Sequence, residues 1–314
     1  MVVAIGLAEF IAAIGGALLL SKRWMTGRNL PRVALLSAGI FVAQMVNFPV
    51  GGGTTGHLIG GALFAILAGP AIAIVGMTAV LLIQALMFGD GGITALGLNA
   101  LNMAVIAPLS GWGVYTLTMP VAESLRGVGK GFAIGMAAWA SVFLSAAACA
   151  AELSVSFAIS GGAYGIAATI SVPAMLGYHA VIGVGEAIIT AGIVAYLLAV
   201  SPEFSMNKPP EQSPVSGLRG VLVSKTVRGT IAVLIVFAAT LPFYFLYASE
   251  GRDGLEQTMA DSGAEGGTPL LTAPFSYGED YFNALLAGIA GFLAVTIASL
   301  GILRLIERLR SEGG

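Results

Sequence analysis

The sequence predicts an all-α integral membrane protein with about nine transmembrane helices, on the strength of its composition and its apolar runs. Hydrophobic residues make up 57% of the 314 residues, charged residues make up only 10%, and the mean hydropathy is +0.92. A soluble domain carries about 25% charged residues, so this chain is too apolar for that class. Its 44 glycines favour closely packed helices, because helices in lipid approach each other through small residues.

The apolar runs predict the helices in order along the chain, because about 18 to 25 apolar residues cross a hydrocarbon core of about 30 Å. They lie at 2–21, 32–49, 57–69, 71–88, 94–118, 130–157, 167–200, 229–248 and 281–305, and the third is the shortest. The first run lacks a basic start and a small-residue cleavage site. We therefore expect a helix there rather than a signal peptide.

Basic residues in the predicted loops orient these helices. They gather after the first, fifth, seventh and ninth runs, which fall on one side of the membrane if the runs alternate. The positive-inside rule assigns that side to the cytoplasm. We expect a multi-pass protein of a bacterial or archaeal cell membrane, with its N-terminus outside and its C-terminus in the cytoplasm.

A polar linker at residues 201–228 divides the chain, because its Ser-Pro and Lys-Pro-Pro sequences stop any helix. Residues 1–200 then form a seven-span block. Residues 229–314 form a two-span module, whose connecting loop from Glu250 to Asp280 is acidic and is predicted to be external.

A glycine-rich break from Pro49 to Gly61 separates two apolar runs and contains His57, one of only two histidines. An imidazole placed where a membrane helix begins has backbone freedom before it and a helix dipole behind it, so it is kept neutral and able to bind a metal. The segment therefore predicts the mouth of a cation site. The alternative is an interfacial histidine that bonds a loop carbonyl.

The second histidine, His179, lies seven residues before Glu186, so the two share one face of the seventh predicted helix. They form either a second metal or proton site or a hydrogen-bonded contact between helices. Asn47, Asn99 and Asn102 lie near the predicted outer mouth and either support the metal loop or pack helices together. Other intramembrane polar groups that need partners are Glu9, Gln44 and Gln84.

Three smaller signals have ordinary structural interpretations. The single cysteine, Cys149, lies in an alanine-rich run and is predicted to be a packed, small hydrophobic residue. Asp90 lies among glycines and is predicted to form a turn. Ala34 and Ala38 form a small-x-x-x-small pair suited to close helix contact.

Rival classes of function fit less well. A secondary cation transporter would use carboxylates at the membrane midplane, and the candidates are Glu9, Glu152 and Glu186. An intramembrane serine protease is set aside, because Ser110 and Ser160 lack the first glycine of a nucleophile motif. The sequence has no phosphate-binding loop for ATP hydrolysis and no basic block for nucleic acid.

Several ordered motifs resemble the substrate-capturing membrane component of energy-coupling-factor cobalt/nickel importers, the CbiM/NikM type. The tail, in which Asp253-Gly254-Leu255-Glu256 precedes one more span, resembles the small two-span NikN-like (PDGLE-type) subunit of the same importers. The motifs that carry the main resemblance lie at 32–38, 41–50, 53–61, 88–97, 99–103 and 179–186.

This resemblance implies a seven-helix S-component bundle fused to a two-helix module. It implies transport of Co²⁺ or Ni²⁺, with no permanently bound cofactor, and an energy-coupling transmembrane subunit and two cytoplasmic ATPases as partners. The family's matching histidine makes His57 a metal ligand, beside the N-terminal amine, the next amide nitrogen and a second-position histidine. Ala34 and Ala38 match a pair that docks on the coupling subunit.

The sequence departs from the family pattern at its start. It begins Met1-Val2-Val3-Ala4 rather than Met-His, so three of the family's four metal nitrogens are missing. We expect an in-frame upstream extension that begins Met-His. As written, the chain is expected to bind metal poorly.

Overall fold

The computed structural model describes residues 2–21, 30–51, 54–125, 128–200, 239, 252–264, 272–277 and 280–311. The predicted linker at 201–228 and the predicted span at 229–248 lie outside the described residues, apart from Ala239. The helices are α1 (Val2–Ser21), α2 (Leu30–Gln44), α3 (Gly61–Ala68), α4 (Pro70–Ile83), α5 (Leu96–Asn99), α6 (Ala107–Ser124), α7 (Gly129–Ile159), α8 (Ala168–Val200), α11 (Gly254–Asp261) and α12 (Tyr281–Ser311).

Two π-helical segments, η1 (Gln84–Phe88) and η2 (Ala100–Ile106), lengthen α4 and join α5 to α6. The described residues then include helical segments that are long and apolar enough to cross a membrane, and the prediction of a multi-pass membrane protein is confirmed. The segments long and apolar enough to cross are Pro70–Phe88, Leu96–Ser124, Gly129–Ile159, Ala168–Leu197 and Tyr281–Arg308. The count of nine transmembrane helices stays a prediction.

The second and third predicted helices are shorter than the apolar runs suggested. The helix predicted at 32–49 ends at Gln44, and the helix predicted at 57–69 contains only the eight residues of α3. Eight residues rise about 12 Å, too little to cross a hydrocarbon core. Gly69 ends α3 with a φ of 85°, and Pro70 starts α4 in a new direction.

The prediction of an all-α protein was wrong at the glycine-rich break, which forms a β-hairpin. Strand β1 (Asn47–Gly51) pairs antiparallel with β2 (Thr54–His57), and the register places Asn47 opposite His57. The hairpin packs closely on α8: a Cβ at Gly56 would lie 2.8 Å from Ile182, and a Cβ at Gly185 would lie 2.7 Å from the ring of Phe48. Glycine is therefore required on both sides of this contact.

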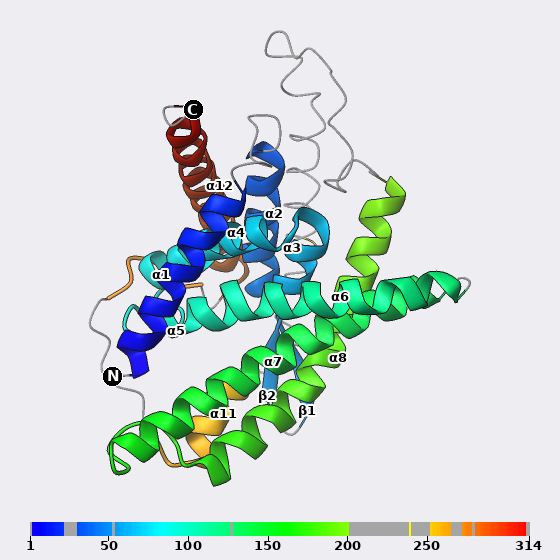
Figure 1. Cartoon of the computed structure of the whole chain (residues 1–314). Helices are drawn as coiled ribbons and strands as arrows, with labels where there is room; N and C mark the ends of the chain where they lie inside the picture. Colours follow the sequence, from blue (N-terminus) through cyan, green and yellow to red (C-terminus); the bar gives the residue numbers. More distant parts are fainter. Residues whose placement is uncertain are drawn as a thin grey trace.

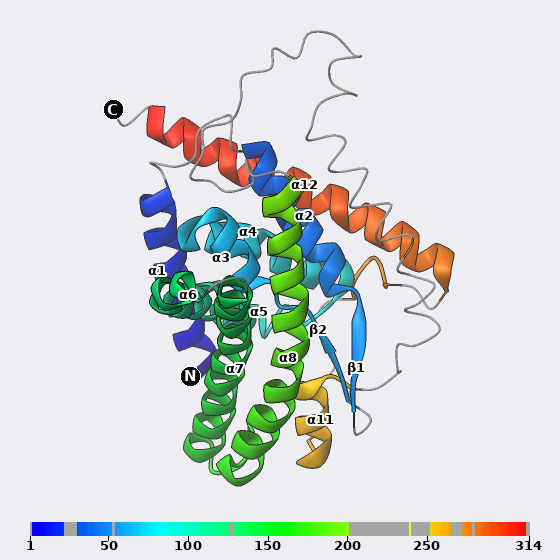
Figure 2. The same ribbon diagram turned by 90° about the vertical axis from the view of Figure 1, so that its right-hand side faces the viewer.

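The long helices α7 and α8 lie side by side, and their linked ends lie at the opposite end of the molecule from α12, as Figure 1 shows. On the other side of the molecule α12 packs chiefly along α2. The hairpin and the short α11 lie beside α8 in the turned view of Figure 2. Segments that are far apart in the sequence therefore meet next to the hairpin.

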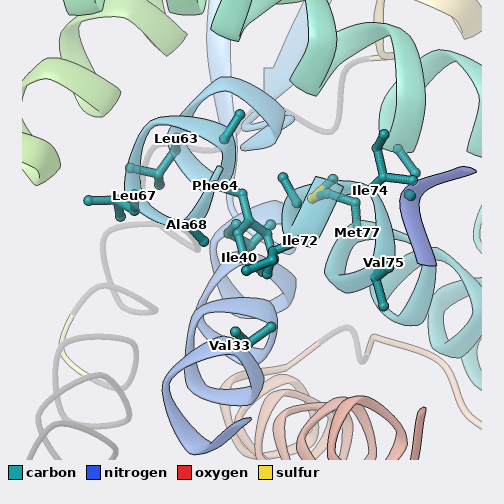
Figure 3. Close-up of a cluster of buried hydrophobic side chains, with 14 of the residues drawn as sticks. Val33, Ile40, Leu63, Phe64, Leu67, Ala68, Ile72, Ile74, Val75 and Met77 are labelled. Carbon is teal, nitrogen blue, oxygen red and sulfur yellow. The ribbon is translucent and has the colours of Figure 1, made fainter. Parts of the chain in front are cut away.

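The main apolar core lies where α2, α3 and α4 meet. Figure 3 shows Phe64 of α3 beside Ile40 of α2 and Ile72 of α4. Phe64 is fully buried, and a Cβ at Gly76 would lie 2.3 Å from its ring. Small residues and tight van der Waals contact hold α3 in place, and this fixes the loop that leads from the hairpin into α3.

Candidate metal site

His57 is the last residue of β2 and precedes α3, so its predicted place at the start of a membrane helix was wrong. The residue is half-buried, and its Nδ1 lies 3.1 Å from the carbonyl oxygen of Leu58. A carbonyl only accepts hydrogen bonds, so Nδ1 carries a proton, and in the neutral imidazole Nε2 then keeps its lone pair. That tautomer is the one that binds a metal through Nε2.

The loop after His57 is fixed by hydrogen bonds from both sides. The amides of Ile59 and Gly60 donate to the two carboxylate oxygens of Glu186, at 2.7 and 2.8 Å. The side-chain amide of Gln44 donates to the carbonyl of Ile59 at 2.7 Å. Glu186 is fully buried, and two amide donors at the start of α3 satisfy its carboxylate, so its observed contacts are those of a structural group.

This hydrogen-bond network continues toward the C-terminal module. Gln84 donates to the side-chain oxygen of Gln44 at 2.9 Å, and the backbone amide of Asp90 donates to the Gln84 carbonyl at 3.1 Å. The hydroxyl of Tyr277 donates to Asp90 at 2.8 Å. Burial, and then the Asp90 carboxylate, raise the pKa of Tyr277 above its usual value. Asp90 lies in a turn, as predicted, and also holds the segment before α12.

A cavity of about 240 Å³ lies next to the hairpin, and both histidines line it. His179 comes from α8, and its Nδ1 lies 2.8 Å from the carbonyl of Met175, one turn earlier. Its Nε2 therefore keeps a lone pair, as that of His57 does. The structure thus brings together two imidazoles that lie far apart in the sequence.

Two of the three predicted supporting asparagines also line this cavity. Asn102 donates through Nδ2 to Glu152 at 2.9 Å, and its buried Oδ1 has no partner among the described residues. Asn99 donates to the carbonyl of Gly91 at 3.3 Å. Asn47 lies across the hairpin from His57, and neither it nor Glu186 is among the lining residues.

Three sulfur-containing residues also line the cavity: Met103, Met175 and Cys149. Cys149 is a half-buried free thiol that packs on a small apolar cluster, in keeping with its predicted packing role. Within the described ranges, no three of the His, Cys, Asp and Glu residues form a group able to hold a metal ion. Any metal in the cavity would therefore have few strong ligands from this part of the chain.

The acidic segment predicted as an external loop contains a helix, α11, against the cavity. Its first turn is a capping box, in which Asp253 accepts from the Glu256 amide at 2.7 Å and its own amide donates to Glu256 at 3.1 Å. Gly254 lies against the ring of His179. The spacing of Asp253 and Glu256 is the sequence signal that would have predicted this helix.

The α11 segment is joined to the hairpin and to α8. The amide of Thr55 in β2 donates to the carbonyl of Arg252 at 2.9 Å. The hydroxyl of Tyr178 donates to Asp261 at 2.9 Å. The C-terminal module therefore contacts both elements that carry the histidines.

The predicted docking pair lies inside the molecule. Ala34 and Ala38 are 1% and 0% exposed, and Ala38 belongs to an apolar cluster that includes Phe292 and Val295 of α12. Helix α2, which carries the pair, packs closely along α12, and Ala38 belongs to the apolar cluster at that contact. Docking of this pair on another subunit stays a prediction.

Comparison with known proteins identifies the family to which this chain is similar. Residues 1–204 match the protein family described as cobalt uptake substrate-specific transmembrane region. Relatives named as fused nickel transport proteins, NikMN, come from Archaeoglobus fulgidus, at 34% identity over 86% of this chain and 84% of the relative, and from Rhodobacter capsulatus, at 39% identity over 67% and 64%.

A solved structure agrees with these relatives. The crystal structure of a truncated transition metal transporter has a TM-score of 0.57 and 35% identity, and the match covers 63% of this chain and 94% of that one. Together these matches confirm the resemblance found in the sequence. The chain belongs to the family of cobalt uptake substrate-specific transmembrane regions, of the CbiM/NikM type, and carries a fused NikN-like module.

Proposed function

We propose that this protein is the substrate-capturing component of an ATP-driven energy-coupling-factor importer for Co²⁺ or Ni²⁺. It captures the metal at its external face through His57 and passes it on through an energy-coupling transmembrane subunit and two cytoplasmic ATPases. The observation that supports this proposal best is the cavity beside the hairpin, which both histidines line. Imidazole nitrogen suits these ions and disfavours Mg²⁺ and Ca²⁺, which prefer oxygen.

One further observation favours a coupled importer over a secondary cation transporter. In the proposed importer the partner ATPases hydrolyse ATP, because this chain's sequence has no phosphate-binding loop. The carboxylates of Glu152 and Glu186, which a secondary transporter would use, each accept a hydrogen bond from protein groups. The division into residues 1–200, 201–228 and 229–314, and the orientation of the termini, belong to the same proposal.

Substitution of His57 tests this proposal in proteoliposomes that also contain the partner subunits. His57→Ala is expected to lower Ni²⁺ or Co²⁺ uptake more than about 100-fold, because even outer partners of a metal site cost about 10–100-fold. Thr54→Val is the matched control: it lies in the same strand, and its buried hydroxyl has no partner among the described residues. Uptake by His57→Ala at the parent rate would refute the proposal.

Removal of ATP separates the two kinds of transporter. Metal uptake by a coupled importer is expected to stop when ATP is removed. Uptake that continues without ATP and the ATPases, and that follows an ion gradient, would instead support secondary transport.

A further inference from the structure

The imidazole of His179 is prepared for metal binding in the same way as that of His57. In each ring Nδ1 is held by a backbone carbonyl, of Met175 at 2.8 Å and of Leu58 at 3.1 Å. Histidines that bind metals usually fix their other ring nitrogen in this manner. Both rings therefore offer a free Nε2, and both line one cavity of about 240 Å³.

An oxygen atom in the same cavity lacks a partner. Asn102 is 6% exposed, and its Oδ1 is buried without a hydrogen bond among the described residues. Its Nδ2 donates to Glu152, which fixes the orientation of the amide. Leaving such an oxygen unpaired in a buried place is unfavourable, and a cation beside it would offset that cost.

The main chain of the C-terminal module covers this part of the cavity. A Cβ at Gly254 would lie 2.6 Å from Cε1 and 3.3 Å from Nε2 of His179. Only a residue without a side chain allows the backbone of α11 to approach the ring so closely. The covering segment is fixed to β2 by the hydrogen bond from Thr55 to Arg252.

We propose that Nε2 of His179 and Oδ1 of Asn102, together with Nε2 of His57, form an inner site where the transported divalent cation rests after capture. The inference rests on the proposed function, because it takes His57 as the first ligand. Two imidazoles and one amide oxygen suit Co²⁺ and Ni²⁺. So few ligands also hold the ion weakly enough for it to leave, which transport requires.

The sequence contains two histidines, so the number of imidazoles bound to a metal in the proposed site can be counted. The full chain, purified with a tag that lacks histidine, is loaded with Cu²⁺ as a spectroscopic probe, and pulsed EPR counts the imidazoles bound to it. The parent is expected to show two imidazoles. His57→Ala and His179→Gln are each expected to show one and to lower the Cu²⁺ affinity about 10-fold or more.

Two further variants separate ligand loss from a folding defect. Gly254→Ala keeps both histidines but displaces the ring of His179, and it is expected to lower the count to one. Tyr178→Phe is the matched control: it removes the neighbouring contact to Asp261 and does not line the cavity, so the count stays at two.

The possible outcomes are distinguishable. A single imidazole in the parent that His179→Gln leaves in place would overturn the inner site, while capture at His57 would stand. Loss of an imidazole in Tyr178→Phe would also overturn it, because docking of α11 would then explain the effect. Cu²⁺ binding that His57→Ala leaves unchanged would contradict the proposed function itself.

Discussion

At the scale of single residues, the site depends on side chains that hold backbone in place as much as on side chains that face the cavity. Glu186 and Gln44 bond the amide and the carbonyl of Ile59 from opposite sides. The sequence placed both among intramembrane polar groups that need partners, but gave no sign of which partner each would find. Those partners are backbone groups of a loop, and loop backbone leaves no pattern in the side chains.

Substitution of the buried carboxylate tests this structural role. Glu186→Gln replaces one of two acceptor oxygens by an NH₂ group that faces an amide donor, so we expect a loss of about 1–3 kcal/mol in the free energy of unfolding. Unfolding by denaturant in detergent measures the loss. Glu152→Gln is the control, because its amide oxygen still accepts from Asn102. Equal stability of Glu186→Gln and the parent would show that the two hydrogen bonds contribute nothing.

Tyr277 gives the structure a dependence on alkaline pH. The phenol of an unfolded chain ionises near pH 10, whereas burial and Asp90 raise the pKa of the folded phenol. The stability from the neutral phenol is therefore fully present below about pH 10 and is lost as the pH rises toward the folded pKa. Tyr277→Phe is expected to cost about 1 kcal/mol at neutral pH and to flatten the alkaline decline. Unfolding measured from pH 8 to 11 tests this, and parallel curves for the two proteins would contradict it.

At the scale of elements, the sequence predicted the long helices well and the site segment poorly. The runs at 130–157 and 167–200 correspond to α7 and α8, because in lipid a long apolar run has few structures available besides a helix. The hairpin was not predicted, because its glycine-rich sequence indicated a break between two helices rather than two paired strands. Its strands are specified by contact with α8 through Gly56 and Gly185, which no local pattern reveals.

The short α3 was missed for a related reason. Its apolar residues look like part of a span, yet Gly69 and Pro70 end it after eight residues. The cavity itself was only half predictable. His57 and His179 were both selected from the sequence, but their meeting depends on the hairpin lying along α8.

A glycine substitution tests the packing that holds α3. Gly76→Ala would place a methyl group 2.3 Å from the ring of Phe64, so we expect a loss of about 1–3 kcal/mol in stability from overpacking. Gly113→Ala in α6 is the control, since nothing lies within 4 Å of its added carbon. The midpoint of thermal unfolding in detergent checks the pair. Similar midpoints for both variants would mean that the core around Phe64 adjusts freely.

At the scale of the whole molecule, the described helices of the C-terminal module pack against different parts of the rest of the chain. Helix α12 packs along α2, and α11 packs against β2 and α8. The first contact lies within an apolar cluster and the second lies at the cavity that both histidines line. The module is therefore positioned to stabilise the bundle and to contact an ion in the proposed inner site.

Division of the chain tests how firmly the module is held. When residues 1–204 and the remainder are produced as separate pieces in one cell, we expect them to purify together. Gly291→Leu is expected to weaken this association strongly, because a Cβ there would lie 2.1 Å from the ring of Phe41. Gly301→Leu, on the same helix with nothing within 4 Å of its Cβ, should have little effect. Loss of association in both variants, or in neither, would contradict the role given to α12.

The contact between α11 and the hairpin has a consequence for how such proteins diverge. It is made by a backbone hydrogen bond from Thr55 to Arg252, just before α11, and Gly254 lies next to it against His179 of α8. Main-chain atoms are the same in every residue type, so this contact depends more on backbone shape than on side-chain identity. An α11 segment from a distant relative could therefore replace this one with many of its side chains changed, provided that a glycine remains at the position of Gly254 and an acceptor for Tyr178 at that of Asp261.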